Sequence, residues 1–338
     1  MNFSLIICTY KRSKALNNLL SSVMRQTIYP NEIIIVDGSP DENTKLMLEE
    51  FTCDNLFYYQ VAAEERGLTK QRNFGISRVD DTAEIVCFLD DDTILKAHYF
   101  EELLNTYLIH TDAVGAGGYI INEEMWFKNE SNYVLKADDF VYDGWRRAEA
   151  KRFIWRKKFG LDSNVSPGFS PSYSHGRSVG FLPPSGMIYP AEQLMGGVSS
   201  FKKDVLEKHK FSNYFEGYGL YEDADFCLRV AKTGNLYINT AAQLEHHHDS
   251  AGRPNMFNYG KMVVRNGWYV WRIKNPNPTL ADRIKWNSIS ILLIIIRFTN
   301  IFTSNKKREA FNESIGRVYG FLSLLFSKPG DNYESYIK

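Results

Sequence analysis

The sequence predicts an α/β fold in which helices cover both faces of a doubly wound, mostly parallel sheet. Up to about residue 120, short apolar runs rich in Ile, Val and Phe alternate with helix-like segments, which is typical of parallel strands joined by helices. Polar residues follow three of these runs directly, at Thr9, Asp37 and Asp90. Because ligands of such sheets bind outside the carboxyl ends of the strands, we expect these three turns to face one crevice.

The expected elements follow one another in order from the amino terminus. Phe3–Cys8 is an apolar strand, and Ser13 is expected to cap a helix that runs to about Arg25 with its leucines on one face. Further strands are expected at Glu32–Val36, Leu56–Val61 and Ala83–Leu89, and further helices at Glu42–Phe51 and Thr69–Arg78.

The regular pattern breaks down between about Asn122 and Pro190. Tryptophans there alternate with Arg and Lys, and a stretch rich in Ser, Pro, Gly and Tyr follows; such long loops are usually functional or disordered. The basic and aromatic part either grips an anionic or lipid-linked acceptor or forms an ordinary solvated helix. Regular structure resumes with helices expected at Phe201–His209 and Glu222–Lys232. We predict a domain over residues 1–260 that contains the 122–190 insertion, followed by a helical extension over 261–338.

The predicted extension is amphipathic. Its most apolar part, Trp286–Phe302, has only eleven uncharged residues between Lys285 and Arg297, whereas a spanning helix needs about 20 apolar residues. We interpret the segment as a helix that lies in a membrane interface. The alternative is a helix packed on the rest of the chain or on a second subunit.

Charge and cysteine usage limit the function classes. Forty basic and forty acidic residues cancel, so no overall field favours nucleic acid as a partner. The cysteines, at positions 8, 53, 87 and 227, form no CxxC pair and read as buried thiols in a reducing compartment. The chain enters its first strand without a signal-peptide pattern. We therefore expect a cytoplasmic location, peripheral on the cytoplasmic face of a membrane.

Three carboxylates in a row, Asp90, Asp91 and Asp92, end the apolar run that begins at Ile85. They repel one another unless a positive group sits among them. Mg²⁺ and Mn²⁺ prefer oxygen ligands and are often shared between carboxylates and substrate phosphates, which favours a metal site for a phosphorylated ligand. The alternative is a solvated acidic turn that caps a helix beginning at Thr93.

A second acidic cluster, Glu222-Asp223-Ala224-Asp225, enters a helix after Gly217-Tyr218-Gly219. One of its carboxylates is a candidate general base, and the alternative is simple charge complementarity at the start of a helix. Upstream, Gly196-Gly197 gives a backbone that a ligand can approach closely.

Three histidines, His246, His247 and His248, precede Asp249 at the end of a strand-like stretch. In an extended chain the first and third point the same way, which allows one of them to reach a metal ion. A single histidine is more often structural.

Six motifs in the right order and spacing resemble family-2 glycosyltransferases of the inverting GT-A type that act on bacterial surface polysaccharides. The resemblance covers about residues 1–260 and rests on these motifs: Ile6-Ile7-Cys8-Thr9-Tyr10, Ile34-Ile35-Val36-Asp37-Gly38-Ser39, Gly67 with Gln71-Arg72-Asn73-Phe74-Gly75-Ile76, Phe88-Leu89-Asp90-Asp91-Asp92, Met195-Gly196-Gly197 and Tyr221-Glu222-Asp223-Ala224-Asp225-Phe226.

The resemblance implies roles position by position. Thr9, Asp37 and Arg72 match positions that hold the base and ribose of a nucleotide-sugar. Asp90 and Asp92 match the Asp-x-Asp motif, with Asp90 nearer the ribose and Asp92 on the metal that bridges the diphosphate.

Five further residues complete the expected site. Asp223 matches the catalytic base, and His246 resembles a histidine that meets the metal in some relatives. Asp91, Gly197 and Glu222 are expected to line the nucleotide-sugar site. The implied cofactor is Mn²⁺ or Mg²⁺, the favoured donor is a UDP-sugar, and the acceptor is a saccharide or a lipid-linked saccharide. A homo-oligomer is consistent with the sequence.

One turn departs from the family pattern, and three other functions fit the residues less well. Many relatives carry an additional Asp or Asn after the second strand, where this chain has Asp37-Gly38-Ser39, so the base of the donor stays open. A nicotinamide-dependent dehydrogenase needs a helix after Gly115-Ala116-Gly117-Gly118, which instead leads into a strand-like run. A sugar nucleotidyltransferase needs a glycine-rich loop after the first strand. A carbohydrate-binding scaffold descended from a transferase would have lost one acidic site, and this chain keeps both.

Overall fold

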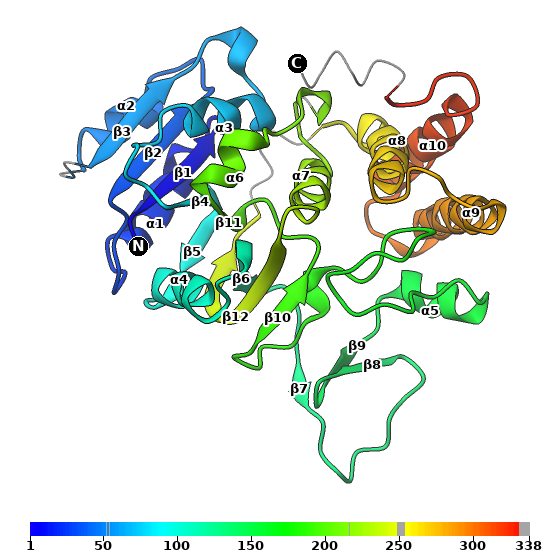
Figure 1. The fold of residues 1–338 in the computed structure, drawn as a ribbon. Coiled ribbons are helices and arrows are strands. Elements are labelled where there is room, and N and C mark those ends of the chain that lie inside the picture. Colours follow the sequence, from blue (N-terminus) through cyan, green and yellow to red (C-terminus); the bar gives the residue numbers. More distant parts are fainter. Residues whose placement is uncertain (52, 54, 216, 249–253, 331–338) are drawn as a thin grey trace. The chain divides into compact units, whose positions relative to one another are not determined.

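The computed structural model describes residues 1–51, 53, 55–215, 217–248 and 254–330 (Figure 1). Asp249 and the end of the predicted extension, 331–338, lie outside the described residues. The chain forms two compact units, one from Met1–Met125 with Val179–Gly252 and one from Trp126–Ser178 with Arg253–Lys338. The predicted division of the chain at residue 260 stays a prediction.

The first unit is built on a sheet that has nine strands in the part of the chain described. The strand order is β10-β12-β6-β11-β4-β1-β2-β3, and β5 pairs with β12 (Figure 1). One direction is shared by β1 (Phe3–Thr9), β2 (Glu32–Asp37), β3 (Leu56–Gln60), β4 (Ile85–Asp90), β6 (Ala113–Ile120) and β12 (Asn235–His246). The opposite direction is taken by β5 (Thr93–Leu95), β10 (Ile188–Ala191) and β11 (Val198–Lys202). The predicted α/β fold with a mostly parallel sheet is therefore confirmed.

Helices cover both faces of this sheet. On one face, α1 (Ser13–Val23) and α4 (Tyr99–Ile109) pack against alternate strand residues such as Leu5 and Ile7, which have no exposed surface. On the other face, Gly75 of α3 (Leu68–Ile76) approaches Ile6, and Phe226 of α7 (Glu222–Val230) packs on Phe201 of β11. The remaining short helices of this unit are α2 (Asn43–Leu48), α6 (Lys203–Lys208), η1 (Ala63–Glu65), η2 (Val179–Phe181) and η3 (Asn213–Phe215).

Three local predictions were wrong. Phe201 and Lys202 belong to β11 and not to a helix, because this strand pairs with β4 on one side and β6 on the other. Ser13 is the first residue of α1, and Arg12 takes the cap position without a side-chain cap bond. No helix begins at Thr93, which opens β5; the next helix begins at Tyr99.

The second unit contains a three-stranded antiparallel sheet that the sequence analysis did not predict. Its order is β7 (Phe127–Lys128), β9 (Trp145–Ala148) and β8 (Asp139–Tyr142), and α5 (Lys151–Lys158) follows. Basic side chains hold it together: the Arg146 guanidinium lies 3.5 Å from the centre of the Tyr133 ring. Arg156 is fully buried and donates to the carbonyls of Leu161 and His175, both at 2.9 Å. Part of the basic and aromatic segment is therefore structural.

The carboxy-terminal part of the second unit is helical: α8 (Met256–Lys274), α9 (Leu280–Thr303) and α10 (Lys307–Ser323). Glycines let α8 and α10 approach closely, since a Cβ at Gly260 would lie 2.1 Å from the carbonyl oxygen of Glu313. The indole rings of Trp271 and Trp286 stack at 5.3 Å and join α8 to α9.

Helix α9 is the one helix, among the residues described, that is long and apolar enough to cross a membrane. Only Trp286, Ile289 and Ile294 of this helix are buried. Arg297, which interrupts the apolar run in the sequence, pairs with Glu313 of α10 at 2.5 Å. The charge of Arg297 is therefore neutralised inside the helical layer.

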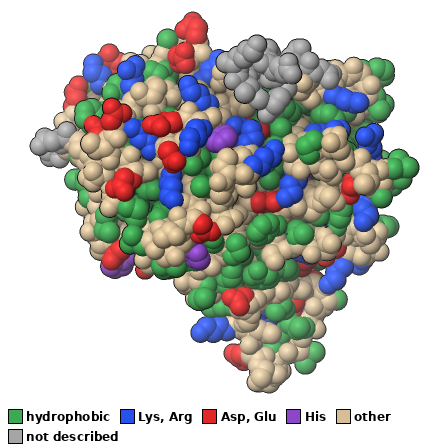
Figure 2. Space-filling model, viewed as in Figure 1, with side chains coloured by type: hydrophobic (Ala, Val, Ile, Leu, Met, Phe, Trp, Pro, Cys, Tyr) green, Lys and Arg blue, Asp and Glu red, His purple; other side chains and the backbone are tan. Residues whose placement is uncertain are grey.

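The charged side chains agree with the charge balance of the sequence, and the cysteines agree with the expectation of free thiols. Acidic and basic side chains are interspersed on the face shown in Figure 2. All four cysteines are free thiols; Cys87 and Cys227 are buried, and Cys8 and Cys53 are partly so.

Candidate functional site

One edge of the sheet in the first unit collects the residues that carry chemistry. Strands β1, β2, β4, β6 and β12 all end at this edge, because they run in the same direction. Strand β11 runs against them, so its amino end brings Gly196 and Gly197 to the same place. The topology alone therefore gathers turns that are far apart in the sequence.

The carboxylate of Asp91 anchors the first acidic set. It is 3 % exposed, and it accepts a hydrogen bond from the Thr9 hydroxyl at 2.7 Å and one from Arg12 at 3.1 Å. Burial raises the pKa of Asp91 to about 7, against the opposing effects of Thr9 and Arg12. These bonds order the turn after β4, and a direct contact of Thr9 or Asp91 with a nucleotide-sugar stays a prediction.

Asp90, Asp92 and His246 form a potential metal site. One ligand atom from each lies within 4.8 Å of the other two, and Nε2 of His246 is 3.0 Å from Oδ1 of Asp92. Burial alone would lower the pKa of His246, but Asp92 and Glu123 raise it to about 10. A positive charge is therefore favoured at this point. Two carboxylates and one imidazole fit a divalent cation such as Mn²⁺.

The two glycines at the amino end of β11 lie between the acidic sets. A Cβ at Gly197 would lie 2.0 Å from Cγ of Asp90, and a Cβ at Gly196 would lie 2.5 Å from Oε1 of Glu222. The amide of Gly196 also donates to Oδ2 of Asp223 at 3.2 Å. No side chain fits here without displacing a carboxylate.

A buried arginine joins the two acidic sets. Arg72 is 2 % exposed, pairs with Glu222, and lies 3.5 Å from Oδ1 of Asp90. Its guanidinium lies 5.2 Å from the ring centre of Phe211 and 5.9 Å from that of Phe88. Burial would lower the pKa of Arg72, but Glu222 and Asp90 raise it, so the arginine stays charged.

Glu222 and Asp223 differ sharply in environment. Glu222 is 5 % exposed, and burial raises its pKa to about 8, with the charge of Asp223 adding to the shift and Arg72 opposing it. Asp223 is more exposed; its Oδ1 accepts from the amide of Ala224 at 2.7 Å. Tyr221, just before α7, has a φ of 73°, and such strained backbone is common at functional sites.

Asp37 reaches the expected edge but has no exposed surface. Its Oδ1 accepts from the amide of Ser39 at 2.7 Å, and its Oδ2 accepts from the Tyr58 hydroxyl at 3.0 Å. These bonds order the turn after β2. A direct contact between Asp37 and a nucleotide stays a prediction.

Two residues of the site were missed in the sequence. Arg12 bridges Asp91 and Asp92, and Glu123 lies 3.4 Å from Nδ1 of His246. Both follow strands of the common direction, β1 and β6. The rule that polar residues after parallel strands face one crevice applies to Arg12 directly. It would apply to Glu123 too, once the run that contains Gly115 is placed in the same sheet.

The chain matches a known protein family. The family described as glycosyl transferase family 2 matches residues 4–172, which is half of the chain.

Curated relatives agree with this match. The chain is 30 % identical over 147 residues to a glucosyl-dolichyl phosphate glucuronosyltransferase of Haloferax volcanii, covering 41 % of this chain and 46 % of that protein. It is 31 % identical over 162 residues to an O-antigen chain rhamnosyltransferase of Salmonella typhimurium, covering 48 % of each. The match spans about half the length of these two relatives.

Solved structures support the fold. Residues 1–349 of TarS from S. aureus superpose with a TM-score of 0.51 at 15 % identity, covering 96 % of this chain and 80 % of that one. A structure of GalNAc-T7 with UDP, GalNAc and Mn²⁺ superposes with a TM-score of 0.52 at 15 % identity, covering 78 % and 47 %.

Proposed function

The chain belongs to glycosyl transferase family 2, and from this membership we propose that it transfers a sugar from a nucleoside diphosphate sugar to an acceptor hydroxyl with inversion at the anomeric carbon. One observation carries the proposal: two acidic sets, which end β4 and begin α7, meet at one sheet edge across Arg72 and the Gly196–Gly197 turn. A donor sugar requires this arrangement, since its diphosphate and the attacking hydroxyl lie on opposite sides of one carbon.

We propose that Asp92 and His246, with Asp90 beside them, hold a divalent metal, for which Mn²⁺ is favoured. When bound, such an ion neutralises the charge that develops on the departing diphosphate. Asp90, whose side chain is 40 % exposed, is proposed to contact the ribose as well. Thr9, Arg12 and Asp91 keep the turn after β4 in place through their mutual hydrogen bonds.

Asp223 is proposed as the general base. Its two oxygens are aligned by the amides of Gly196 and Ala224, and its carboxylate lies at the amino end of α7. It would take the proton of the acceptor hydroxyl as that oxygen attacks, a contribution of about 10² to 10⁴ in rate. Glu222 is unsuited to this role because it is buried and paired with Arg72.

The donor and the acceptor are proposed from relatives. GalNAc-T7 was solved with UDP, GalNAc and Mn²⁺, which supports a UDP-sugar and manganese. The names of the curated relatives refer to an O-antigen chain and a glucosyl-dolichyl phosphate, so we propose a saccharide or a lipid-linked saccharide as acceptor, in polysaccharide or glycolipid assembly.

The test of the base is Asp223→Asn, with Asp204→Asn as a matched control. Asp204 is an exposed acid in the first turn of another helix, α6, and should tolerate the change. We expect Asp223→Asn to lower transfer by at least about 10² while calorimetry shows donor binding with Mn²⁺ unchanged. Equal loss of binding and transfer would reject the assignment. Asp92→Ala should instead weaken Mn²⁺-dependent donor binding.

We also propose that α9 lies on an anionic membrane surface. Apolar side chains spaced along one face of this helix are exposed: Leu280, Ile284, Ile291, Ile295 and Phe302, at 46 to 83 %. Because Arg297 is turned toward Glu313, no charge breaks this stripe. Exposed basic residues flank it at positions 283, 285 and 306–308, as expected for a helix in a bilayer interface with acidic lipids.

Vesicle sedimentation tests the membrane proposal. We expect the protein to bind vesicles with phosphatidylserine more tightly than neutral vesicles. Changing Ile291 and Ile295 together to Asn should abolish binding, whereas Leu108→Asn, at an exposed apolar position in α4, should not. If the double variant binds equally well, or if the stripe proves to mediate self-association in light scattering, the membrane proposal fails.

A further inference from the structure

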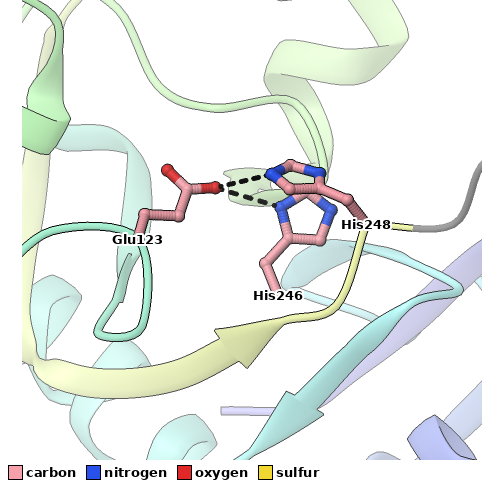
Figure 3. A group of neighbouring side chains, drawn as sticks. All are labelled: Glu123, His246 and His248. Atoms are coloured by element: carbon pink, nitrogen blue, oxygen red, sulfur yellow. Dashed lines mark hydrogen bonds and ion pairs between the residues drawn. The ribbon is translucent and has the colours of Figure 1, made fainter. Parts of the chain in front are cut away.

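The ring of His246 lies between two carboxylates, one at each ring nitrogen. Its Nε2 faces Asp92 at 3.0 Å, and its Nδ1 faces Oε1 of Glu123 at 3.4 Å. The same oxygen lies 3.3 Å from Nε2 of His248 (Figure 3). Glu123, His246 and His248 therefore form a second group whose ligand atoms all lie within 4.8 Å of one another.

Backbone contacts hold this second group together. Asn122, beside Glu123, accepts from the amide of His246 at 2.9 Å and donates to its carbonyl at 3.0 Å. The amide of His247 donates to the carbonyl of Asp92 at 2.8 Å. The ring of His247 turns away and contacts Glu245 at 3.0 Å, whereas the rings of His246 and His248 lie 4.1 Å apart.

We propose that Glu123, His246 and His248 bind a Zn²⁺ ion at a site separate from the Asp90 and Asp92 carboxylates. Two imidazoles and one carboxylate are a donor set that Zn²⁺ accepts readily, with a fourth position left for water. Glu123 and His248 are exposed, so the ion and its water have access. The group with two carboxylates favours the harder ions Mn²⁺ and Mg²⁺. Ligand chemistry thus separates the two sites.

The shared histidine makes the two sites exclusive. A metal ion that binds His246 displaces one proton from the charged imidazole, so one ring nitrogen holds the ion and the other still carries a proton. His246 can offer Nε2 to the ion beside Asp92 or Nδ1 to the ion beside Glu123, but not both. Zinc in the second site is therefore expected to lower the affinity of the first site for Mn²⁺. This competition rests on the proposed function of the first site, whereas the zinc site itself does not.

Calorimetry with Zn²⁺ on the full chain, without donor, tests the site. We expect the wild-type protein and the control His247→Gln to bind Zn²⁺ alike. His248→Gln should weaken Zn²⁺ by more than about tenfold and leave Mn²⁺ binding unchanged. Glu123→Gln should also weaken Zn²⁺ and serves as the second variant if His248→Gln misfolds. Unchanged Zn²⁺ affinity in both variants would overturn the site.

Electron paramagnetic resonance of free Mn²⁺ tests the competition separately. Adding Zn²⁺ to the Mn²⁺-loaded wild-type protein should release Mn²⁺, and His248→Gln should require more Zn²⁺ for the same release. Release at the same Zn²⁺ concentration in both proteins would place zinc at the Asp90 and Asp92 carboxylates and overturn the proposal. A protein that binds Zn²⁺ as expected but never binds Mn²⁺ would instead contradict the proposed function.

Discussion

The substitution Gly197→Ala should disable the metal site without removing any ligand. An alanine Cβ would lie 2.0 Å from Cγ and 2.1 Å from Oδ2 of Asp90. Carbon atoms in contact are normally about 3.5 Å apart, so the carboxylate must move by about 1.5 Å. That displacement also disturbs the contact between Asp90 and Arg72, which lies 3.5 Å away.

The expected cost follows from this displacement. Metal sites tolerate only about 0.2 Å in ligand distance, and a misplacement of about 1 Å in an active site can lower the rate about 10²-fold. We therefore expect Gly197→Ala to weaken Mn²⁺-dependent donor binding and transfer by about that factor. Calorimetry of donor binding with Mn²⁺ is the direct assay.

Two other glycines separate this effect from a general cost of crowding. A Cβ at Gly75 would lie 2.7 Å from a methyl group of Ile6, so Gly75→Ala should lower the melting temperature but spare metal binding. A Cβ at Gly196 would meet Glu222 and the guanidinium of Arg72, at 2.5 and 2.8 Å, and not Asp90, so Gly196→Ala should lower transfer but leave Mn²⁺ binding by Asp92 and His246 in place. If Gly197→Ala binds donor and Mn²⁺ normally, Asp90 has no part in the metal site.

Three further changes test other parts of the structure. The pKa of Glu222 is raised to about 8, so the folded state gains stability from the protonated carboxyl at low pH and loses it as pH rises to about 8; Glu222→Gln also removes the partner of buried Arg72, so the melting temperature of the variant relative to wild type should be more favourable at pH 8.5 than at pH 5, and the same difference at both pH values would contradict the shift. Arg12→Gln leaves buried Asp91 without its cation and should lower the free energy of unfolding by about 1–3 kcal/mol in urea titration; no change would mean that the pair contributes nothing. Gly316→Ala puts a Cβ 2.0 Å from the carbonyl oxygen of Phe257 and should cost about 1–3 kcal/mol in the second unit, measured by hydrogen exchange of α8 and α10, where undisturbed exchange would contradict the close helix contact.

The fold could be predicted where the pattern is local. Strands β1, β2 and β4 are continuous apolar runs, and their ends agree with the prediction within a residue or two. Strand β11, which ends at Lys202, shows where local patterns fail to predict a strand. It has no continuous apolar pattern, because Ser199 and Ser200 lie at its centre. Only its two neighbours, β4 and β6, make it a strand.

The site could be predicted only in part for a related reason. Motif residues such as Asp92 and Asp223 stand in recognisable clusters, but their supports do not. Arg12 belongs to the site only because β1 lies next to β4. Glu123 follows β6, whose glycines carry no apolar side chains to mark a strand; a Cβ at Gly115 would lie 2.6 Å from the ring of Phe201. Pairing between distant strands decided both cases.

The late position of β11 in the chain has a consequence for biosynthesis. Val198 pairs with Leu89, and the long stretch between them must be made before that ladder closes, which slows folding. A nascent polypeptide halted before Gly196 carries the triple aspartate but lacks both Gly197 and Asp223. On the ribosome, the chain would thus lack one of its two acidic sets until its last sheet strands emerge.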